Sequence, residues 1–146
     1  MRINETRKIV IIGAGPMGLS LAYFLLKKAS VFLVVRNQMQ RDNLKTNGFK
    51  LKNESAEKPN LERLTILSSI EDLSLIDEID LVFIATKSTN LYDVCTALKK
   101  VLSKNTFVIS YQNGFNTGKY IIENLLSQNV LRMVLHYGAD IENNNE

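Results

Sequence analysis

The sequence predicts an α/β protein built on a doubly wound, mainly parallel sheet. Short apolar runs recur along the chain, and most are continuous rather than alternating, which is typical of strands buried on both faces. Segments with helical character fall between these runs, as the crossovers of a parallel sheet require. The 146 residues suit one domain, which we expect to span residues 1–146 with a frayed polar tail at 141–146.

The elements follow from the pattern of apolar and turn residues. Strands are expected at 8–12, 31–35, 64–67, 81–85, 106–111 and 130–135, and helices at 16–28, 38–46, 90–102 and 117–126. Pro16 suits the first turn of the first helix, where its missing N–H costs nothing. The polar stretch 48–61 contains Pro59 and indicates a hairpin or a surface excursion, and residues 68–80 indicate a loop or a short helix.

Charge and composition argue against nucleic-acid and membrane partners. The formal net charge is +3, but neither a dense basic run nor a nucleic-acid-binding motif accompanies it. Residues 9–26 are uncharged and by length could form a signal segment or a short membrane span. Three glycines and a proline interrupt that stretch, and a strand, a turn and a helix explain the same residues. We therefore expect neither export nor insertion.

The single cysteine, Cys95, allows no intramolecular disulfide, so a reducing cytoplasm is the expected location. Cys95 falls within a predicted helix and is interpreted as a small buried residue. Together with the single histidine, His136, it lacks the spacing of a metal site, and no metal is expected.

A glycine motif joins the first strand to the first helix. The segment Gly13-Ala14-Gly15-Pro16-Met17-Gly18 matches G-x-G-x-x-G in the context that a dinucleotide-binding Rossmann fold requires. Gly13 permits the tight turn, Gly15 lets the backbone approach a pyrophosphate, and Gly18 lets the helix lie close to the sheet. Free N–H groups at the helix start then favour an anion. The alternative is a glycine turn that holds no ligand.

The residue after the second strand bears on which dinucleotide is bound. In NAD-binding domains an Asp or Glu near this position accepts a hydrogen bond from the ribose 2′-hydroxyl, whereas an arginine accommodates a 2′-phosphate. Here the position holds Arg36, whose planar guanidinium suits a bidentate phosphate contact. We therefore expect NADP rather than NAD. The alternative is a solvated arginine at a strand end.

Three further loops should meet the glycine turn in one crevice, because ligands bind outside the carboxyl ends of such strands. The fourth strand ends in Ala85-Thr86-Lys87-Ser88, the fifth in Tyr111-Gln112-Asn113-Gly114-Phe115, and the sixth in His136-Tyr137-Gly138-Ala139. Lys87 offers a cation to the cofactor or to an acidic substrate. Asn113 offers an amide to a nicotinamide ribose or a substrate oxygen. The alternative for Asn113 is a plain Asn-Gly turn.

Six segments in order, KIVIIGAGPMG, VVRN, TNGFKL, DLVFIATKSTN, SYQNGF and HYGAD, cover the chain from about residue 8 to residue 140. Together they resemble the nucleotide-binding domain of the ketopantoate reductase (2-dehydropantoate 2-reductase) family. The glycine motif is shared by many dehydrogenases, whereas the segments at the ends of the fourth and fifth strands are more specific. The resemblance implies NADPH-dependent reduction of ketopantoate to pantoate, a step toward pantothenate and coenzyme A.

The resemblance also implies roles for individual residues. The glycine turn, with Ala14, Pro16 and Met17, holds the pyrophosphate, and Arg36 takes the 2′-phosphate. Further cofactor contacts are implied for Thr86, Lys87, Asn90, Asn113 and Ala139. Lys87 lies by the nicotinamide, Asn113 contacts the nicotinamide ribose and the substrate, and both are candidates for a catalytic role. Asn90 stands where the family often has glutamine, and Ala139 stands where a backbone contact to the nicotinamide amide is expected.

Members of the family continue into a C-terminal helical domain that carries the catalytic lysine, and that domain is expected to be absent here, since the lysine would lie beyond Glu146. The chain would then supply the cofactor-binding half and act on a small keto acid only when completed by a helical domain. The alternatives are an NADP-binding module or truncated remnant without reductase activity, and a related keto-acid reductase. Apolar surface left uncovered favours a homo-oligomer or a partner chain.

Overall fold

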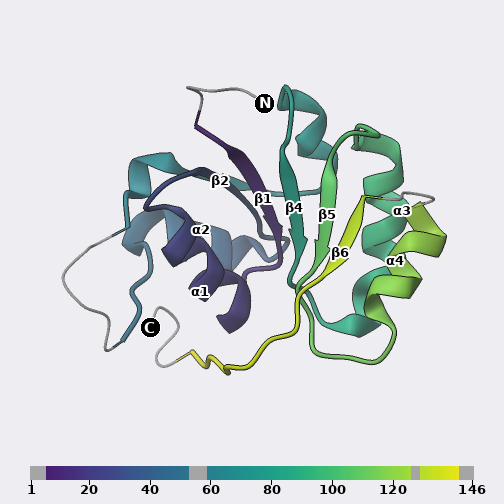
Figure 1. The fold of residues 1–146 in the computed structure, drawn as a ribbon. Coiled ribbons are helices and arrows are strands. Elements are labelled where there is room, and N and C mark those ends of the chain that lie inside the picture. The colour runs from purple at the N-terminus through teal and green to yellow at the C-terminus, as the bar shows by residue number, and fades with distance from the viewer. Residues whose placement is uncertain (1–5, 53–58, 126–128, 142–146) are drawn as a thin grey trace.

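The computed structural model describes residues 6–52, 59–125 and 129–141, which form one six-stranded sheet (Figure 1). Its order is β3-β2-β1-β4-β5-β6, and every neighbouring pair is parallel. The strands are β1 (Lys8–Ile12), β2 (Ser30–Val34), β3 (Leu64–Leu67), β4 (Leu81–Ile84), β5 (Phe107–Ser110) and β6 (Val130–Arg132). The predicted doubly wound α/β fold of Rossmann type is confirmed, and the sheet is parallel throughout.

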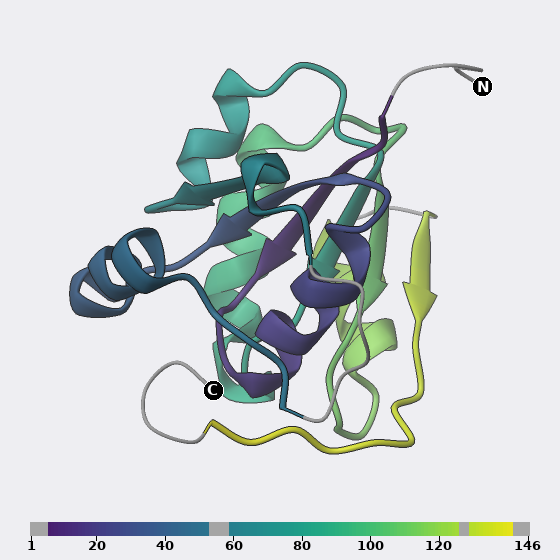
Figure 2. The same ribbon diagram turned by 90° about the vertical axis from the view of Figure 1, so that its left-hand side faces the viewer.

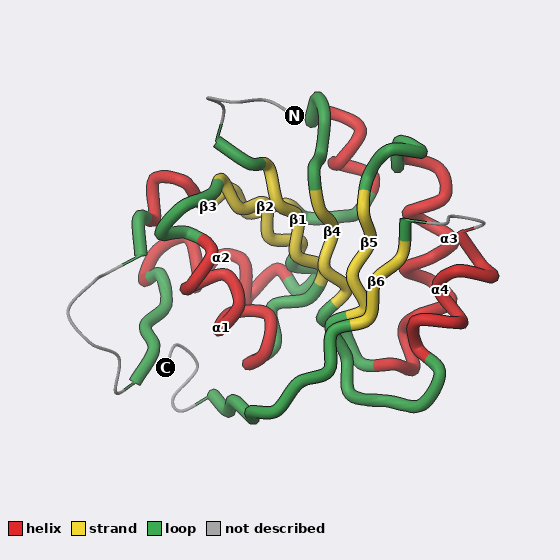
Figure 3. Tube along the Cα trace, viewed as in Figure 1, coloured by secondary structure: helices red, strands yellow, loops and turns green. Residues whose placement is uncertain are grey.

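Helices connect successive strands, as Figure 3 shows in red. The α-helices are α1 (Pro16–Leu25), α2 (Gln38–Asn47), α3 (Leu91–Val101) and α4 (Thr117–Leu125). Three short 3₁₀ helices lie in the connections, η1 (Leu61–Arg63), η2 (Glu71–Leu75) and η3 (Ser88–Asn90). The predicted helices are therefore present, and the stretch 68–80 contains the short helix that was one of its two readings.

The sheet separates two apolar layers, because successive side chains of a strand point to opposite faces. On β1, Ile9 and Ile11 pack with α1 and α2, whereas Val10 and Ile12 pack with α3 and α4. The two pairs of helices cover opposite faces, and Figure 2 turns the α1 and α2 side toward the viewer. Burial on both faces is why the strands read as continuous apolar runs.

Most predicted boundaries shift by a single residue, whereas α1 and β6 each end three residues earlier than predicted. Helix α1 ends at Leu25 instead of 28, because the backbone N–H groups of Lys28 and Ala29 bond to Leu25 in a turn that returns the chain to β2. Strand β6 ends at Arg132 instead of 135, where the chain leaves the sheet edge after a last bond from Met133 to Ser110. In the stretch 48–61, residues 48–52, 59 and 60 form no strand, and 53–58 lie outside the described residues.

The chain beyond β6 crosses the carboxyl end of the sheet toward the α1 side (Figures 1 and 2). Leu135 and Ile141 pack against the core cluster on that side. Ile141 is thus partly buried rather than part of a frayed tail, and residues 142–146 lie outside the described part.

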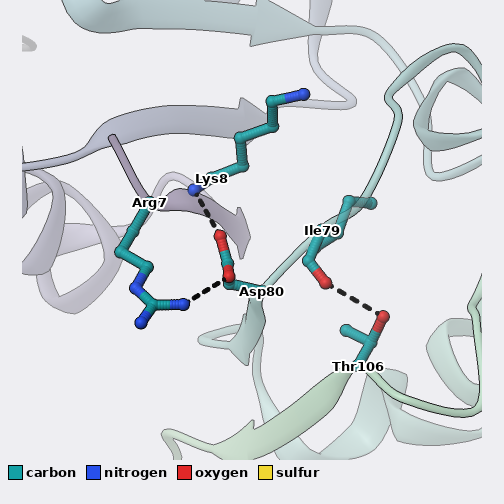
Figure 4. Close-up of polar contacts among 5 residues, drawn as sticks. All are labelled: Arg7, Lys8, Ile79, Asp80 and Thr106. Atoms are coloured by element: carbon teal, nitrogen blue, oxygen red, sulfur yellow. Dashed lines mark hydrogen bonds and ion pairs between the residues drawn. The ribbon is translucent and has the colours of Figure 1, made fainter. Parts of the chain in front are cut away.

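Side chains fasten the opposite, amino end of the sheet (Figure 4). Asp80, before β4, accepts hydrogen bonds from the Lys8 backbone N–H and from Arg7 Nη1, each at 2.8 Å. The Thr106 hydroxyl donates to the Ile79 backbone oxygen at 3.1 Å. These contacts join β1, β4 and β5 at their starts, far along each strand from the carboxyl ends where ligands bind in such sheets.

Candidate functional site

A cleft of about 840 Å³ opens at the carboxyl ends of the strands. It lies over the point between β1 and β4 where the strand order reverses, which is the usual ligand position in an open α/β sheet. Its walls come from five strand ends and from α1, α2 and α3. The lining residues include Gly13, Ala14, Gly15, Pro16, Met17, Arg36, Gln40, Ser69, Ile70, Glu71, Thr86, Lys87, Asn90, Asp93, Tyr111, Gln112, Asn113 and Leu135.

Two of the three motif glycines are required by the packing of the protein itself. Gly13 has φ +109°, and a Cβ there would lie 3.0 Å from the Thr86 backbone nitrogen. A Cβ on Gly18 would lie only 2.0 Å from the Gly13 backbone oxygen. Gly18 is buried beneath the turn and does not line the cleft. It therefore acts on the site by letting α1 approach β1, as the motif predicts.

Gly15 is different, because neither its backbone nor its protein neighbours require glycine. Its φ of −73° and ψ of 179° are open to any residue, and a Cβ there would meet nothing within 4 Å. Gly15 is the N-cap of α1, which begins with Pro16 and has no side-chain cap and no acidic residue in its first turn. The start of α1 thus presents its positive end to open space in the cleft.

The turn is held from α2 by a residue that the motif does not include. Gln40 Nε2 donates to the Ala14 backbone oxygen at 2.6 Å. Gln40 is in the first turn of α2, and that turn is capped by Asn37, whose Oδ1 accepts from the Gln40 backbone N–H at 2.9 Å. This contact was not predicted, because the local sequence around 37–40 indicates only a helix start.

Arg36 lies at the cleft wall two residues beyond the end of β2, with an exposed side chain. Its backbone is held by Arg41, whose Nη1 donates to the backbone oxygens of Val35 at 2.9 Å and Arg36 at 2.7 Å. The Val35 backbone N–H bonds in turn to Leu67 at the end of β3. The peptide of Arg36 is therefore fixed, while its guanidinium stays available at the cleft.

Acidic side chains that were not predicted to belong to the site also line the cleft, one of them shortly after β3. Ser69 and Glu71 line the same cleft as Arg36, and Asp93 reaches it from α3. Asp72 holds the loop, since its Oδ2 accepts from the hydroxyl and backbone N–H of Ser68 and from the backbone N–H of Ser69. The Ser68 hydroxyl, followed by these N–H groups, lowers the pKa of Asp72 and keeps the carboxyl ionised.

The ends of β4 and β5 bring together four of the predicted residues. Thr86, Lys87, Asn90 and Asn113 all line the cleft. The Asn113 loop is anchored on both sides. The Ser110 hydroxyl donates to the Thr117 hydroxyl at 2.8 Å in a buried pair, and Arg132 Nη2 on β6 donates to the Gly114 backbone oxygen at 3.0 Å.

Fewer residues of the loop after β6 line the cleft than the sequence predicts. Leu135 lines the cleft, but His136, Tyr137, Gly138 and Ala139 are not among its lining residues. The segment runs instead along the α1 side, where the hydroxyls of Tyr111 and Tyr137 hydrogen-bond. Burial, and then this hydrogen bond, raise the pKa of Tyr111, so its hydroxyl stays protonated. The structure thus does not bring Ala139 to the other predicted residues.

Metal binding, membrane spanning and thiol chemistry find no support among the described residues. Among them, no group of three His, Cys, Asp or Glu side chains is placed to hold a metal ion. Within the same ranges, no helix has the length and apolar character needed to cross a membrane. Cys95 is buried, and burial raises the pKa of its thiol to about 11. A thiol with that pKa is a poor nucleophile at neutral pH.

The family profile for ketopantoate reductase PanE/ApbA matches residues 9–146. The chain belongs to this family. A search of curated protein sequences finds no match. The resemblance found in the sequence is therefore confirmed by a match over nearly all of the chain.

Solved structures support the same assignment. A probable 2-dehydropantoate 2-reductase from Bacillus subtilis is 25% identical, with a TM-score of 0.70, over 94% of this chain and 44% of that one. A PanE/ApbA family ketopantoate reductase from Ralstonia eutropha is 26% identical, with a TM-score of 0.70, over 92% and 43%. Glycerol-3-phosphate dehydrogenase from Saccharomyces cerevisiae shares the fold at 17% identity and a TM-score of 0.70, over 88% and 41%. The chain spans less than half of each of these proteins.

Proposed function

We propose that this chain binds NADP(H) at the carboxyl edge of its sheet and supplies the cofactor-binding half of a reductase for 2-dehydropantoate. The open space at Gly15 is the main evidence for the proposal. Gly13 and Gly18 are explained by contacts within the protein, but Gly15 is not. A glycine that leaves space open at an uncapped helix start is what a bound pyrophosphate needs, because backbone N–H groups can then reach its oxygens.

The choice of NADP over NAD rests on Arg36. Its guanidinium lies exposed at the cleft wall after β2, where a 2′-phosphate is recognised in this fold. Arg41 holds the Arg36 backbone oxygen, so the guanidinium is carried on a fixed peptide. A charge-assisted, bidentate contact would favour the phosphate over a ribose hydroxyl.

The remaining cleft residues suit the nicotinamide half and a keto acid. Bound NADPH supplies the hydride. Lys87 would place a cation near the carboxylate of an acidic substrate, and Asn113 would bond to the nicotinamide ribose or the substrate oxygen through its amide. Reduction also requires a proton donor for the ketone oxygen. In this proposal a helical domain or a partner chain supplies that donor and completes the substrate pocket.

A second candidate is a related keto-acid reductase that uses NAD. A D-mandelate dehydrogenase solved with NADH and anilino(oxo)acetate is 25% identical, with a TM-score of 0.59, over 85% of this chain and 39% of that one. Glu71 lines the same cleft as Arg36, and a carboxylate there could accept from a ribose 2′-hydroxyl. A domain that binds the cofactor without reducing a substrate would show the same dinucleotide binding as one of these two candidates.

Calorimetric titration with NADPH and then with NADH tests the proposal. We expect NADPH to bind at least about tenfold more tightly, and Arg36→Ala to remove that preference. Lys45→Ala removes an exposed cation on α2 outside the cleft and serves as the charge-matched control, with an unchanged preference. Failure to bind either dinucleotide would contradict the whole proposal, whereas preference for NADH would support the second candidate.

A further inference from the structure

Gln112, two residues beyond the end of β5, is buried at the base of the cleft. Only 5% of its surface is exposed, yet it lines the cleft between Thr86 and Asn113. Neither the glycine motif nor the Arg36 position accounts for it. A large, buried amide at such a place requires hydrogen-bonding partners for both its nitrogen and its oxygen.

The nitrogen of the amide is satisfied within the protein. Gln112 Nε2 donates to the Thr86 backbone oxygen at 2.5 Å and lies 3.3 Å from the Thr86 hydroxyl. Reversing the amide would set its oxygen against the Thr86 carbonyl oxygen, where neither atom could donate. The chemistry of this contact therefore assigns the two ends of the amide.

The oxygen of the amide has no partner. Among the described residues, Gln112 Oε1 is the one buried side-chain nitrogen or oxygen without a hydrogen bond. The neighbouring Ser110 pairs with Thr117, and Thr106 before β5 pairs with the Ile79 carbonyl, so the other buried polar side chains at the two ends of β5 have hydrogen-bond partners. Leaving an acceptor unpaired in such surroundings costs free energy, which a donor in the cleft would recover.

We propose that Gln112 is a further cofactor-binding residue, whose side-chain oxygen accepts a hydrogen bond from the nicotinamide riboside half of the bound dinucleotide. This inference rests on the proposed function. The sheet order places β2, with Arg36, and β5, with Gln112, on opposite sides of β1 and its glycine turn. A dinucleotide with its pyrophosphate at the turn and its 2′-phosphate at Arg36 must direct its nicotinamide half toward β4 and β5.

That half of the cofactor carries the required donors, namely the ribose hydroxyls and the carboxamide N–H groups. The adenosine half lies toward β2 and β3 and cannot supply them to Gln112. The contact would also act on the protein, because the same amide holds Thr86 at the end of β4. Gln112 would thus bind the nicotinamide riboside while linking the Thr86 and Asn113 loops.

The test compares ligands that share or lack the nicotinamide half. Gln112→Met keeps the approximate volume but removes the donor and the acceptor. We expect it to weaken binding of NADPH by about fivefold to tenfold, the effect of one hydrogen bond, while adenosine 2′,5′-bisphosphate binds within about twofold of wild type. Equal weakening of both ligands, or unchanged binding of NADPH, would overturn the inference.

Two further measurements separate binding from folding. Thr106→Val removes the hydrogen bond from Thr106 to the Ile79 backbone oxygen at the amino end of the sheet, outside the cleft, so we expect it to lower the melting temperature without changing NADPH affinity. If Gln112→Met does not fold, the side-chain amide resonance of Gln112 in the wild type decides. It should shift with NADPH but not with adenosine 2′,5′-bisphosphate, and an unchanged resonance with both would refute the contact.

The reduced 3-acetylpyridine analogue of NADPH identifies the donor, since it lacks the carboxamide N–H groups and keeps the ribose. Equal binding of this analogue to wild type and Gln112→Met would assign the donor to the carboxamide. A fivefold loss would assign it to the ribose hydroxyls. If wild type binds neither NADPH nor NADH, the proposed function itself fails, whereas intact binding with no Gln112 effect defeats this inference alone.

Discussion

Gln40 Nε2 on α2 donates a hydrogen bond to the Ala14 backbone oxygen in the glycine turn at 2.6 Å. This contact links the helix of the second crossover to the turn that begins the first, and it fixes the peptide that precedes Gly15. It therefore joins the wall that carries Arg36 to the turn that is proposed to hold the pyrophosphate.

Gln40→Met should weaken NADPH binding by about threefold to tenfold, because the turn would lose the bond that orients it. The free energy of unfolding should fall by about 1 kcal/mol. Gln38→Met, on the exposed first turn of the same helix, is the matched control and should change neither quantity. Calorimetry and urea unfolding measure the two effects, and equal behaviour of the two variants would show that the Gln40 contact is unimportant.

Gly15→Ala should separate ligand binding from stability. A Cβ there meets nothing within 4 Å and the backbone angles are ordinary, so stability should stay constant or rise by about 0.4–1 kcal/mol. Dinucleotide affinity should fall by at least about tenfold, since the methyl group occupies the approach of the pyrophosphate. Thermal unfolding and calorimetry test both statements, and undiminished affinity would contradict the phosphate site.

Gly18→Ala, in contrast to Gly15→Ala, should lower the stability of the protein. Its Cβ would lie 2.0 Å from the Gly13 oxygen, so α1 would have to move away from β1. We expect a loss of about 1–3 kcal/mol in the free energy of unfolding, the usual cost of overpacking. Chemical denaturation of this variant measures that loss, and wild-type stability would show that α1 can shift freely.

Glu71→Gln should increase the preference for NADPH. Glu71 and Arg36 line the same cleft, and the carboxylate opposes a 2′-phosphate. We expect NADPH to bind about twofold to fivefold more tightly at low salt, with the gain vanishing at high salt, and NADH to be unaffected. Glu62→Gln, exposed on η1 outside the cleft, is the control. Weaker binding of NADH in Glu71→Gln would instead assign Glu71 to the ribose hydroxyls.

Cys95 should make stability fall in alkaline solution. Burial raises the pKa of its thiol from 9.0 to about 11, so between these values the folded protein keeps a proton that the unfolded chain has released. The free energy of unfolding therefore decreases as pH rises from about 9 to about 11. Urea unfolding across this range should show a shallower decline for Cys95→Ala, and identical slopes would contradict the assignment. The native thiol should also resist a thiol reagent at pH 8 until urea is added.

Much of the fold could be predicted because its signals are local. Continuous apolar runs arise where strands are buried on both faces, and the glycine motif combines a positive φ at Gly13 with a tight helix approach at Gly18. The helix ends and β6 were less accurate, since the position where a chain leaves a sheet edge depends on its partners. The Met133-to-Ser110 bond, which ends β6, joins segments that no local pattern relates.

The candidate site was predictable only in part for the same reason. Most residues predicted to bind the cofactor line one cleft, but Ala139 lies outside it because the chain after β6 follows the α1 side. Glu71 and Gln40 were missed, since each reaches the cleft through strand order and helix packing rather than through a motif. Gln112 was seen as part of a strand end, but its unpaired oxygen exists only in the folded arrangement.

The sequence by itself determined the class of fold, the glycine turn and the family, because each depends on short segments whose residues are adjacent along the chain. Tertiary structure decided which chemical groups share the cleft. It placed the acidic segment after β3 in the same cleft as Arg36, set Gln40 on the turn, and left one amide oxygen of Gln112 without a partner. These outcomes depend on strand order and on the packing of helices against the sheet. Both bring together residues that are distant in sequence, and those contacts decide whether each buried polar group has a hydrogen-bond partner.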